Sequence, residues 1–412
     1  MGKTRVGVGF ATGRKNFQHV LKNYILNWKE SGLIENDDIE INVYVAYDLT
    51  YKGTRKSDYT SIPEEIKSMI QETHFFGEEE IAAAKEELVG RGITDISGAS
   101  LLFGNGYAAQ RNLILFNAIR DNMDCLLFID DDDYPFAVTR NRYVAIWSGQ
   151  QVLKKHIENI QGSDITCGYH CGYISPIPTA SFIDDAETQI FKTLIEALSN
   201  DIVNWNSLRE VMNNGGVTYA DTKILVENEP VDVPEINRAK FISGSNLCIN
   251  LTDPRRVFPF YNPPGARGED TFLSTCLSER RVLRIPCYTF HDGFSVYENL
   301  LSGVLPTQLS RVDPTKEQNI QRFLSACIGW ARYKPLLLYI TQPESYREKI
   351  NEAQSELSAA LPYVCNYFKM REFLDVQKEM LAYDAYVSIH CDAFHKTKEL
   401  WAELMDNICS AG

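Results

Sequence analysis

YAAQRNLILFNAIRDNMDCLLFIDDDDYP, residues 107–135, sets a helical pattern before an apolar strand that runs straight into four aspartates. Leu126–Ile129 precede Asp130–Asp133 without a spacer. Like charges a few Å apart repel one another by roughly 1 kcal/mol even in water, and by more at a half-buried strand end. A divalent cation would compensate for this repulsion, because carboxylate oxygens are good ligands for Mg²⁺, Mn²⁺ and Ca²⁺.

Strand and helix patterns alternate around this segment through the first 125 residues. β-rich apolar runs predict strands at residues 5–12, 40–48 and 125–130. Apolar spacing and stop signals predict helices at residues 17–32, 64–92 and 107–122. The alternation predicts an α/β fold whose mainly parallel sheet is flanked by helices. Ligands bind such sheets at the carboxyl ends of the strands, where Asp48 and Asp130 lie.

The remaining chain is expected to continue the sheet and then to become helical. The patterns predict a helix at 143–160, a strand at 241–251, a short helix at 268–280 and a strand at 281–293. Asp313-Pro314 is a good helix start. The following residues line one helical face: Ile320, Phe323, Leu324, Cys327, Ile328 and Ala331. We therefore expect an α/β domain over residues 1–300 and an all-α domain over residues 301–412.

The composition is that of an ordinary soluble globular protein, with 44% hydrophobic and 23% charged residues in 412. The net charge of −14 argues against a nucleic-acid partner, which would require a basic surface. We find neither an apolar run of about 18 residues, as a transmembrane helix needs, nor a signal-peptide pattern at the start. The ten cysteines are therefore expected to be free thiols of a cytoplasmic protein.

Two clusters of chemistry-bearing residues also have simpler interpretations. Cys167, His170 and Cys171 lack zinc-knuckle spacing and a second pair, so a buried strand and turn is favoured over a zinc site. The aspartate run suits a solvated loop or a helix start, where acids favour the dipole. A lone exposed aspartyl nucleophile would need no such run. An EF-hand fails, because position 6 from Asp130 is Pro135 rather than Gly.

GNGYAAQRNLILFNAIRDNMDCLLFIDDDDYP, residues 104–135, resembles a stretch found in GT-A glycosyltransferases. There a Gly-containing turn and an Arg-Asn helix lead into a strand that ends in an Asp-x-Asp motif, and Arg111 stands at the Arg position. The resemblance extends from residue 5 to about residue 300. It implies a GT-A, Rossmann-like fold with Mn²⁺ or Mg²⁺ on Asp130 and Asp132. It also implies that Asp130 and Asp131 contact a nucleotide sugar, with Arg111 near its phosphates.

Three residues near the ends of the first two strands match the nucleotide-binding part of that family. The loop VGFATGRKN, residues 8–16, would cradle the nucleotide, with Thr12 and Arg14 near the base and ribose. Asp48 matches the acid that commonly hydrogen-bonds the base. For each of these residues, a turn position is the simpler alternative.

Catalytic residues are implied by the downstream segment PPGARGEDTFLS, residues 263–274, which resembles the family's Glu-Asp motif. Asp270 would be the catalytic base and Glu269 its neighbour, with a pKa tuned upward by burial or charge. The alternative is an acid that complements a helix dipole. His291 follows an apolar strand and would complete the metal site; a structural histidine is the alternative.

The resemblance predicts a metal-dependent glycosyltransferase that moves a sugar from a nucleoside-diphosphate sugar to an acceptor hydroxyl, with inversion if Asp270 is the base. Bacterial surface polysaccharide synthesis would suit such an enzyme, with a glycan, lipid-linked or small-molecule acceptor. The C-terminal helices could bind the acceptor, form a homodimer or contact a membrane peripherally. No Gln-x-x-Arg-Trp motif is found, which excludes a processive synthase of that kind.

Three other functions stay open. A nucleotidyltransferase that makes an activated sugar would use the loop GFATGRKN, residues 9–16, but would not need a Glu-Asp helix. A dinucleotide oxidoreductase is disfavoured, because Gly7, Gly9 and Gly13 are one residue away from the Rossmann fingerprint. A non-catalytic nucleotide-sugar-binding protein would keep the fold and lose turnover.

Overall fold

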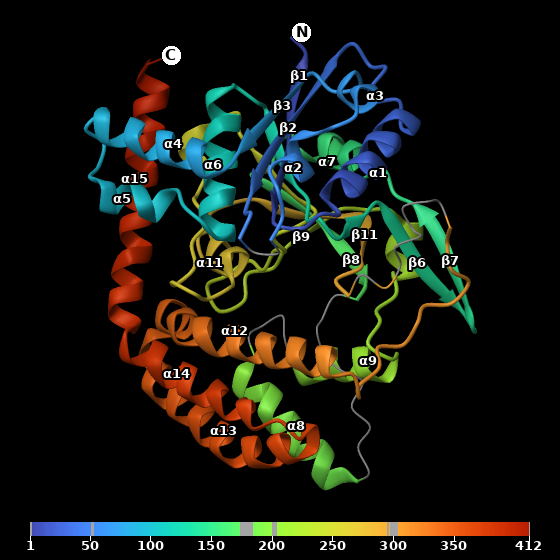
Figure 1. The fold of residues 1–412 in the computed structure, drawn as a ribbon, viewed down its shortest axis with the longest axis vertical. Coiled ribbons are helices and arrows are strands. Elements are labelled where there is room, and N and C mark those ends of the chain that lie inside the picture. Colours follow the sequence, from blue (N-terminus) through green and yellow to red (C-terminus); the bar gives the residue numbers. More distant parts are fainter. Residues whose placement is uncertain are drawn as a thin grey trace.

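The central sheet of the computed structural model has a parallel half and a mixed half (Figure 1). The structure describes residues 2–50, 53–173, 184–199, 204–294, 296 and 304–411. Within these ranges the strand order is β3-β2-β1-β4-β10-β8-β11-β5, and β9 also pairs with β11. The strands are β1 (Thr4–Thr12), β2 (Ile39–Tyr47), β3 (Glu72–Phe76), β4 (Cys125–Phe128), β5 (Asp133–Tyr134), β8 (Ile165–Gly172), β9 (Val231–Asp232), β10 (Leu247–Asn250) and β11 (Val282–His291).

Strand direction differs between the two halves of the sheet. β1 pairs in parallel with β2 and β4, and β2 pairs in parallel with β3. β10 then runs antiparallel to both β4 and β8, whereas β11 is parallel to β8 and antiparallel to β5. The sheet is therefore mixed, which corrects the expectation of a mainly parallel one. Helical crossovers impose parallel pairing on the first strands, but β10 follows a long segment without a simple crossover.

Two segments expected to be helical contain strands. Residues 64–92 form α3 (Glu64–Lys67), β3 and α4 (Glu78–Gly90). Pairing of β3 with the central strand β2 overrides the helix-favouring residues around it. Residues 143–160 begin with β7 (Val144–Gly149), which pairs with β6 (Phe136–Asn141) in a hairpin, before α7 (Val152–Ile160).

Helices cover both faces of the sheet and enclose two hydrophobic cores (Figure 1). α1 (Phe17–Glu30) and α7 pack on one face with Val8 and Leu127. α4, α5 (Ile96–Leu102) and α6 (Tyr107–Arg120) pack on the other with Leu126 and Phe128. Neighbouring residues of β4 thus enter opposite cores, as the alternation of side chains along a strand requires.

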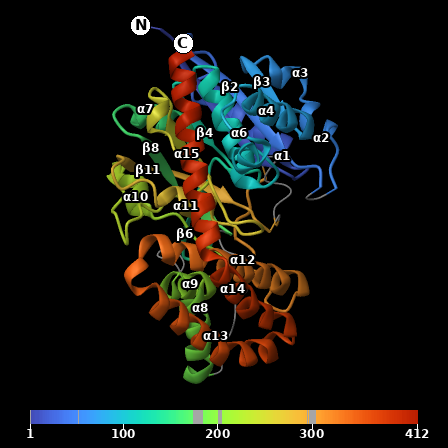
Figure 2. The ribbon, with the colours of Figure 1, turned by 90° about the vertical axis from the view of Figure 1, so that its left-hand side faces the viewer.

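A helical region lies at one end of the sheet, as the C-terminal pattern predicts (Figure 2). Its third core joins α12 (Glu317–Thr341), α13 (Tyr346–Phe368), α14 (Asp375–Ala385) and the start of α15 (Val387–Ala411). The expected face of α12 is buried, with Ile328 partly so. The core also takes in α8 (Asp185–Leu198) and α9 (Trp205–Asn213), so packing crosses residue 300. The division into domains at that residue stays a prediction.

The last helix returns to the sheet. Val387 and Phe394 belong to the third core, whereas Leu400, Trp401 and Leu404 belong to the core between the sheet and α6. α15 therefore bridges the helical region and the sheet. Among the described residues, none of the helices combines the length and the apolar character needed to cross a bilayer. The other short helices are α2 (Ser57–Thr60), α10 (Thr222–Glu227), α11 (Glu269–Ser274), η1 (Pro254–Arg256), η3 (Pro343–Ser345) and η4 (Arg371–Leu374).

Candidate functional site

The aspartate run lies at the end of the sheet where β1, β4 and β11 have their carboxyl ends. β4 ends at Phe128, and the run leads into β5, which pairs antiparallel with β11. Asp133 stands directly opposite His291 in this pairing. Asp131, Asp132 and Asp133 are all buried, and Asp133 is fully so. Three adjacent carboxylates with little access to water need nearby cations or donors.

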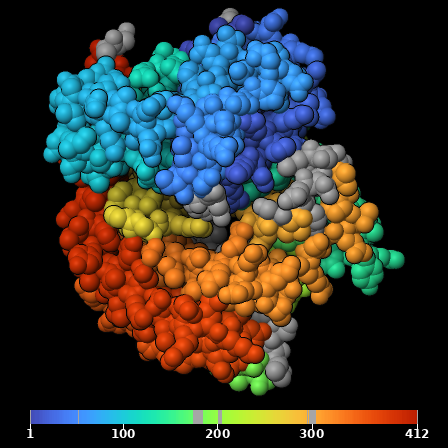
Figure 3. Space-filling model, viewed as in Figure 1, coloured from blue at the N-terminus to red at the C-terminus, as the bar shows by residue number. Residues whose placement is uncertain are grey.

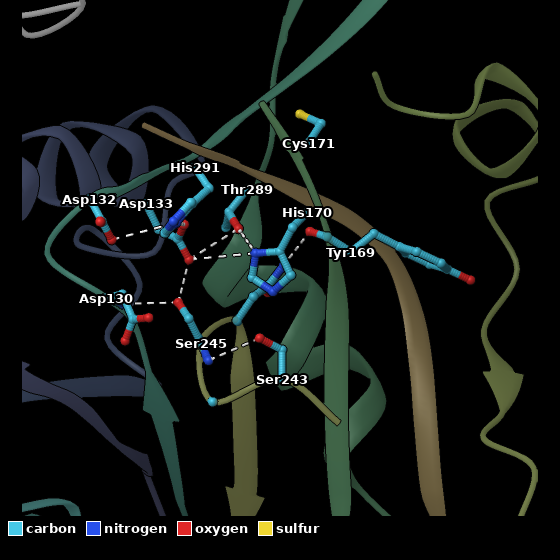
Figure 4. A network of polar contacts seen from close by, with 12 residues as sticks. Asp130, Asp132, Asp133, Tyr169, His170, Cys171, Ser243, Ser245, Thr289 and His291 are labelled. Carbon is cyan, nitrogen blue, oxygen red and sulfur yellow. Dashed lines mark hydrogen bonds and ion pairs between the residues drawn. The ribbon is translucent and has the colours of Figure 1, made fainter. Parts of the chain in front are cut away.

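Asp132, Asp133 and His291 form an arrangement that could hold a metal ion (Figure 4). One ligand atom from each lies within 4.8 Å of the others. His291 Nδ1 is 2.9 Å from Asp133 Oδ1 and 3.5 Å from Asp132 Oδ1. Burial opposes protonation of His291, but the two carboxylates raise its pKa to about 9. In the described part of the chain, no other cluster of this kind is found.

The second oxygen of Asp133 is held by protein donors. Ser245 Oγ donates to Oδ2, and Thr289 Oγ1 lies 3.4 Å from the same oxygen. His170 Nδ1 lies 3.6 Å from Oδ2 and 2.9 Å from Thr289 Oγ1 (Figure 4). Burial opposes ionisation of Asp133, but the hydrogen bond from His291 and the nearby His170 hold its pKa at about 2. The carboxylate is thus fixed with Oδ1 toward His291.

Sequence reasoning missed Asp133 as a candidate ligand, together with its supporting residues. Thr289 and His291 are two positions apart on β11, so strand alternation would have put them on one face. His170 pairs with Thr289 in the register of β8 and β11, which the sequence does not reveal. Ser245 gave no signal of its own.

Asp131 and Asp132 contact the loop that follows β1. Thr12 Oγ1 donates to Asp131 Oδ2 at 2.5 Å. Arg14 Nη1 donates to Asp132, and its Nε lies 3.5 Å from Asp131. Burial raises the pKa of Asp131 to about 7, although Arg14 opposes that rise. The structure therefore brings Thr12, Arg14 and the aspartates together, as the sequence predicts.

Asp48 also lies at this edge but has no contact with the aspartates. Its backbone N–H donates to the carbonyl of Thr12 at 2.9 Å, so it adjoins the same loop. Its carboxylate accepts from the backbone N–H and hydroxyl of Thr50, at 2.8 and 2.6 Å. The Asp48 side chain thus stabilises a turn, which is the simpler role considered for it in the sequence. The turn adjoins the loop that would hold a nucleotide.

Arg111 is a buried cation on α6 that faces Asp130. Its Nη2 donates to Asp130 Oδ1 at 2.8 Å, and its Nε lies 3.6 Å from Glu269 Oε1. The guanidinium also lies 5.0 Å from the ring centre of Phe128. Asp130 therefore turns toward Arg111 and is not part of the group of Asp132, Asp133 and His291 that could hold a metal ion, so its role as a metal ligand stays a prediction. Asp130 pairs with Arg111 because the buried guanidinium is the cation nearest to its carboxylate.

Glu269 and Asp270 open α11 beside Arg111. Asp270 accepts from the backbone N–H groups of Gly244 and Thr271, at 3.0 and 2.8 Å. Burial and the neighbouring Asp270 raise the pKa of Glu269 to about 7. The carbonyl of Gly244 accepts from Arg111, so the short segment Gly244-Ser245 ties together Asp270, Arg111 and Asp133.

Cys167, His170 and Cys171 lie on β8, the buried strand that the sequence favours for them. Both cysteines are buried in β8, and His170 contacts Thr289 and Asp133 instead. All ten cysteines are free. The buried-strand interpretation is therefore confirmed, and His170 gains a place beside the acidic cluster.

Comparison with known proteins adds little to this geometry. No protein-family model matches the chain, and no curated protein sequence matches it. Among solved structures, the chain resembles the apo form of mouse xyloside xylosyltransferase 1, with 11% sequence identity and a TM-score of 0.20. The match covers 46% of this chain and 57% of that chain, so the chain spans little over half of that neighbour. At this TM-score the likeness carries no argument.

Proposed function

We propose that the protein is a metal-dependent glycosyltransferase of the GT-A type, which moves a sugar from a nucleoside-diphosphate sugar to an acceptor hydroxyl. The observation that carries the proposal is the buried group of Asp132, Asp133 and His291 at the ends of β4 and β11, with Arg14 against Asp132. Carboxylates and cations at the carboxyl edge of an α/β sheet suit a ligand that carries both a metal ion and phosphates.

The donor set fits a resident Mn²⁺ ion. Two carboxylates and one imidazole form a mixed oxygen and nitrogen site, whereas Mg²⁺ favours oxygen ligands alone. Asp133 fits this role because Ser245 and Thr289 occupy one of its oxygens and leave the other beside His291. When bound, the ion would neutralise the charge of the leaving diphosphate.

The protein's own side chains would position the donor. Thr12 and Arg14 would contact the nucleotide, with Asp48 near the base. Arg14 is the cation closest to the metal ligands and could transfer its contacts from Asp131 and Asp132 to phosphate oxygens. Arg111 would hold Asp130 and Glu269 in place, because it is buried between them and has little freedom to move.

A carboxylate of α11 would act as the base. In an inverting transfer, the acceptor hydroxyl loses its proton to Asp270 as its oxygen bonds to the anomeric carbon. The bond from that carbon to the diphosphate oxygen breaks at the same time. Glu269 is the second candidate, because burial raises its pKa to about 7, which suits proton transfer near neutrality.

We further propose a glycan, lipid-linked or small-molecule acceptor, a cytoplasmic location and a role in bacterial surface polysaccharide synthesis. A nucleotidyltransferase, or a nucleotide-sugar-binding protein without turnover, is the alternative. The products separate these functions. A glycosyltransferase releases nucleoside diphosphate, a nucleotidyltransferase releases pyrophosphate, and a binding protein releases neither.

The test is thermal stability against a panel of nucleoside diphosphates, triphosphates and nucleotide sugars, each with and without Mn²⁺. A ligand at 100 times its dissociation constant should add about 2.7 kcal/mol to the free energy of unfolding. A shift for one diphosphate that requires Mn²⁺ supports the proposal and identifies the donor base. A shift with triphosphates alone favours the nucleotidyltransferase. No shift with any compound contradicts nucleotide binding at this edge.

A further inference from the structure

The β6–β7 hairpin forms a two-stranded sheet of its own and projects from the side of the molecule (Figures 1 and 3). It exposes several apolar side chains. Trp147 packs inward against Phe290, with ring centroids 4.9 Å apart. Val144 and Ile146 point the other way and are 51% and 47% exposed. Tyr143, in the turn, is 78% exposed. The inner side chains thus anchor the hairpin, while the outer ones stay about half exposed or more in the part of the chain that the structure describes.

A second segment with exposed apolar residues runs beside the edge of β7 that does not pair with β6. The backbone N–H of Ala145 donates to the carbonyl of Thr307 at 2.8 Å, and Trp147 Nε1 donates to that of Pro306 at 2.7 Å. Val304 and Leu305 directly precede this contact and are 59% and 40% exposed. We name the five side chains the hairpin patch: Tyr143, Val144, Ile146, Val304 and Leu305.

The two segments that carry the hairpin patch differ in the sign of their net charge from the whole chain. The chain has 55 acidic residues and a net charge of −14. Residues 134–150 and 304–312 contain no acid, and their only charged residues are Arg140, Arg142 and Arg311. Arg140 lies 5.7 Å from the ring centre of Tyr219, while Arg142 is exposed in the turn. Arg140 pairs with Ala145 and so lies on the inner face with Trp147, which leaves Arg142 as the arginine at the rim of the patch. An apolar patch with an exposed arginine at its rim and no acid in its own segments complements an anionic surface.

The turn of the hairpin holds Arg142 in a backbone conformation that favours glycine or asparagine. Its φ is +55°, in the left-handed region. Two-residue hairpin turns usually place Gly, Asn or Asp at such positions. An arginine kept there at a cost in stability, next to an exposed tyrosine, points to a role at the surface.

We propose that the hairpin patch docks on an anionic membrane surface. Val144, Ile146 and Tyr143 would enter the headgroup region, and Arg142 would pair with lipid phosphates. β6 begins three residues after Asp133, and its six residues span about 20 Å, so docking would hold the acidic site close to the bilayer. If the proposed function is correct, this position favours a membrane-anchored acceptor; the docking itself does not depend on it.

The test is co-sedimentation of the full chain with vesicles of phosphatidylcholine alone or mixed with phosphatidylglycerol. The test variant combines Tyr143→Ser, Val144→Thr and Ile146→Thr, which keep β-branched residues in the strand. A matched control carries Leu381→Gln, Tyr386→Gln and Ile389→Gln, which remove an equally exposed apolar group from α14 and α15. Neither triple variant alters a buried side chain, so both should keep the wild-type melting temperature.

The wild-type protein and the control should sediment with the anionic vesicles, and the hairpin variant should bind them at least about tenfold more weakly. Arg142→Gly should bind about fivefold more weakly, as expected for one arginine at a lipid surface, while its melting temperature rises. Absence of wild-type binding would overturn the proposal, as would full binding by the hairpin variant. Light scattering that finds a dimer lost in the hairpin variant would also overturn it, because the patch would then bind a second copy. Neither measurement requires nucleotide or turnover.

Discussion

Replacement of Glu269 by glutamine should make the protein's stability depend less on pH. Burial and Asp270 raise the pKa of Glu269 from 4.5 to about 7. Because the pKa of Glu269 is higher in the folded protein than in the unfolded one, the protonated side chain favours folding. This contribution to the free energy of unfolding is complete below the unfolded-state pKa and is lost as the pH rises through about 7. At 1.36 kcal/mol per pKa unit the full effect is about 3 kcal/mol, most of which is lost between pH 5 and pH 8.

The assay is urea unfolding of the wild-type protein and Glu269→Gln at pH 5 and pH 8. The free energy of unfolding of the variant relative to wild type should rise by about 2–3 kcal/mol from the lower to the higher pH. Glu279→Gln, at an exposed position nearby, is the matched control and leaves the buried pair untouched. If the difference in free energy of unfolding between Glu269→Gln and wild type is the same at both pH values, burial does not destabilise the ionised form of Glu269, and the prediction is wrong.

Three further predictions concern the site and its support. Asp133→Asn should weaken Mn²⁺ binding by roughly 100-fold or more and abolish metal-dependent turnover. Titration calorimetry measures the affinity, and circular dichroism checks that the variant is folded. Unchanged Mn²⁺ affinity would contradict the ligand role. Arg111→Met should lower the free energy of unfolding, measured with urea, by about 3 kcal/mol, because it leaves Asp130 and Glu269 without their buried cation. A loss below about 1 kcal/mol would contradict this role of Arg111. Trp401→Ala should cost about 3–5 kcal/mol in the same assay, since Trp401 is 1% exposed between α15 and the sheet; a neutral result would show that this contact does not support the sheet.

The sequence predicts the strands and helices of this fold better than their arrangement. The strands at β1, β2, β4 and β11 and the buried face of α12 follow from local patterns of apolar residues. The antiparallel insertion of β10 does not, because strand direction depends on long-range pairing. β3 and β7 were missed because their cross-strand partners, rather than their composition, fix their conformation.

The candidate site follows the same division. Thr12, Arg14, Asp132 and His291 come together as their positions at strand ends predict. Four identical residues give no signal for which of them groups with His291, and in the structure Asp133 does so while Asp130 contacts Arg111. This grouping depends on which carboxylate meets Arg111 and which one lies opposite His291, and both contacts depend on tertiary structure.

The path of α15 has a consequence for how the molecule comes apart. Its 25 residues extend about 37 Å and enter the hydrophobic core at both ends of the molecule (Figure 2). Because one continuous helix is packed into both regions, the helical region and the sheet cannot unfold independently of each other. Calorimetry should therefore record one cooperative transition. Proteolytic removal of the last two turns should loosen the sheet at the far end of the molecule before it disturbs the helices from which α15 departs.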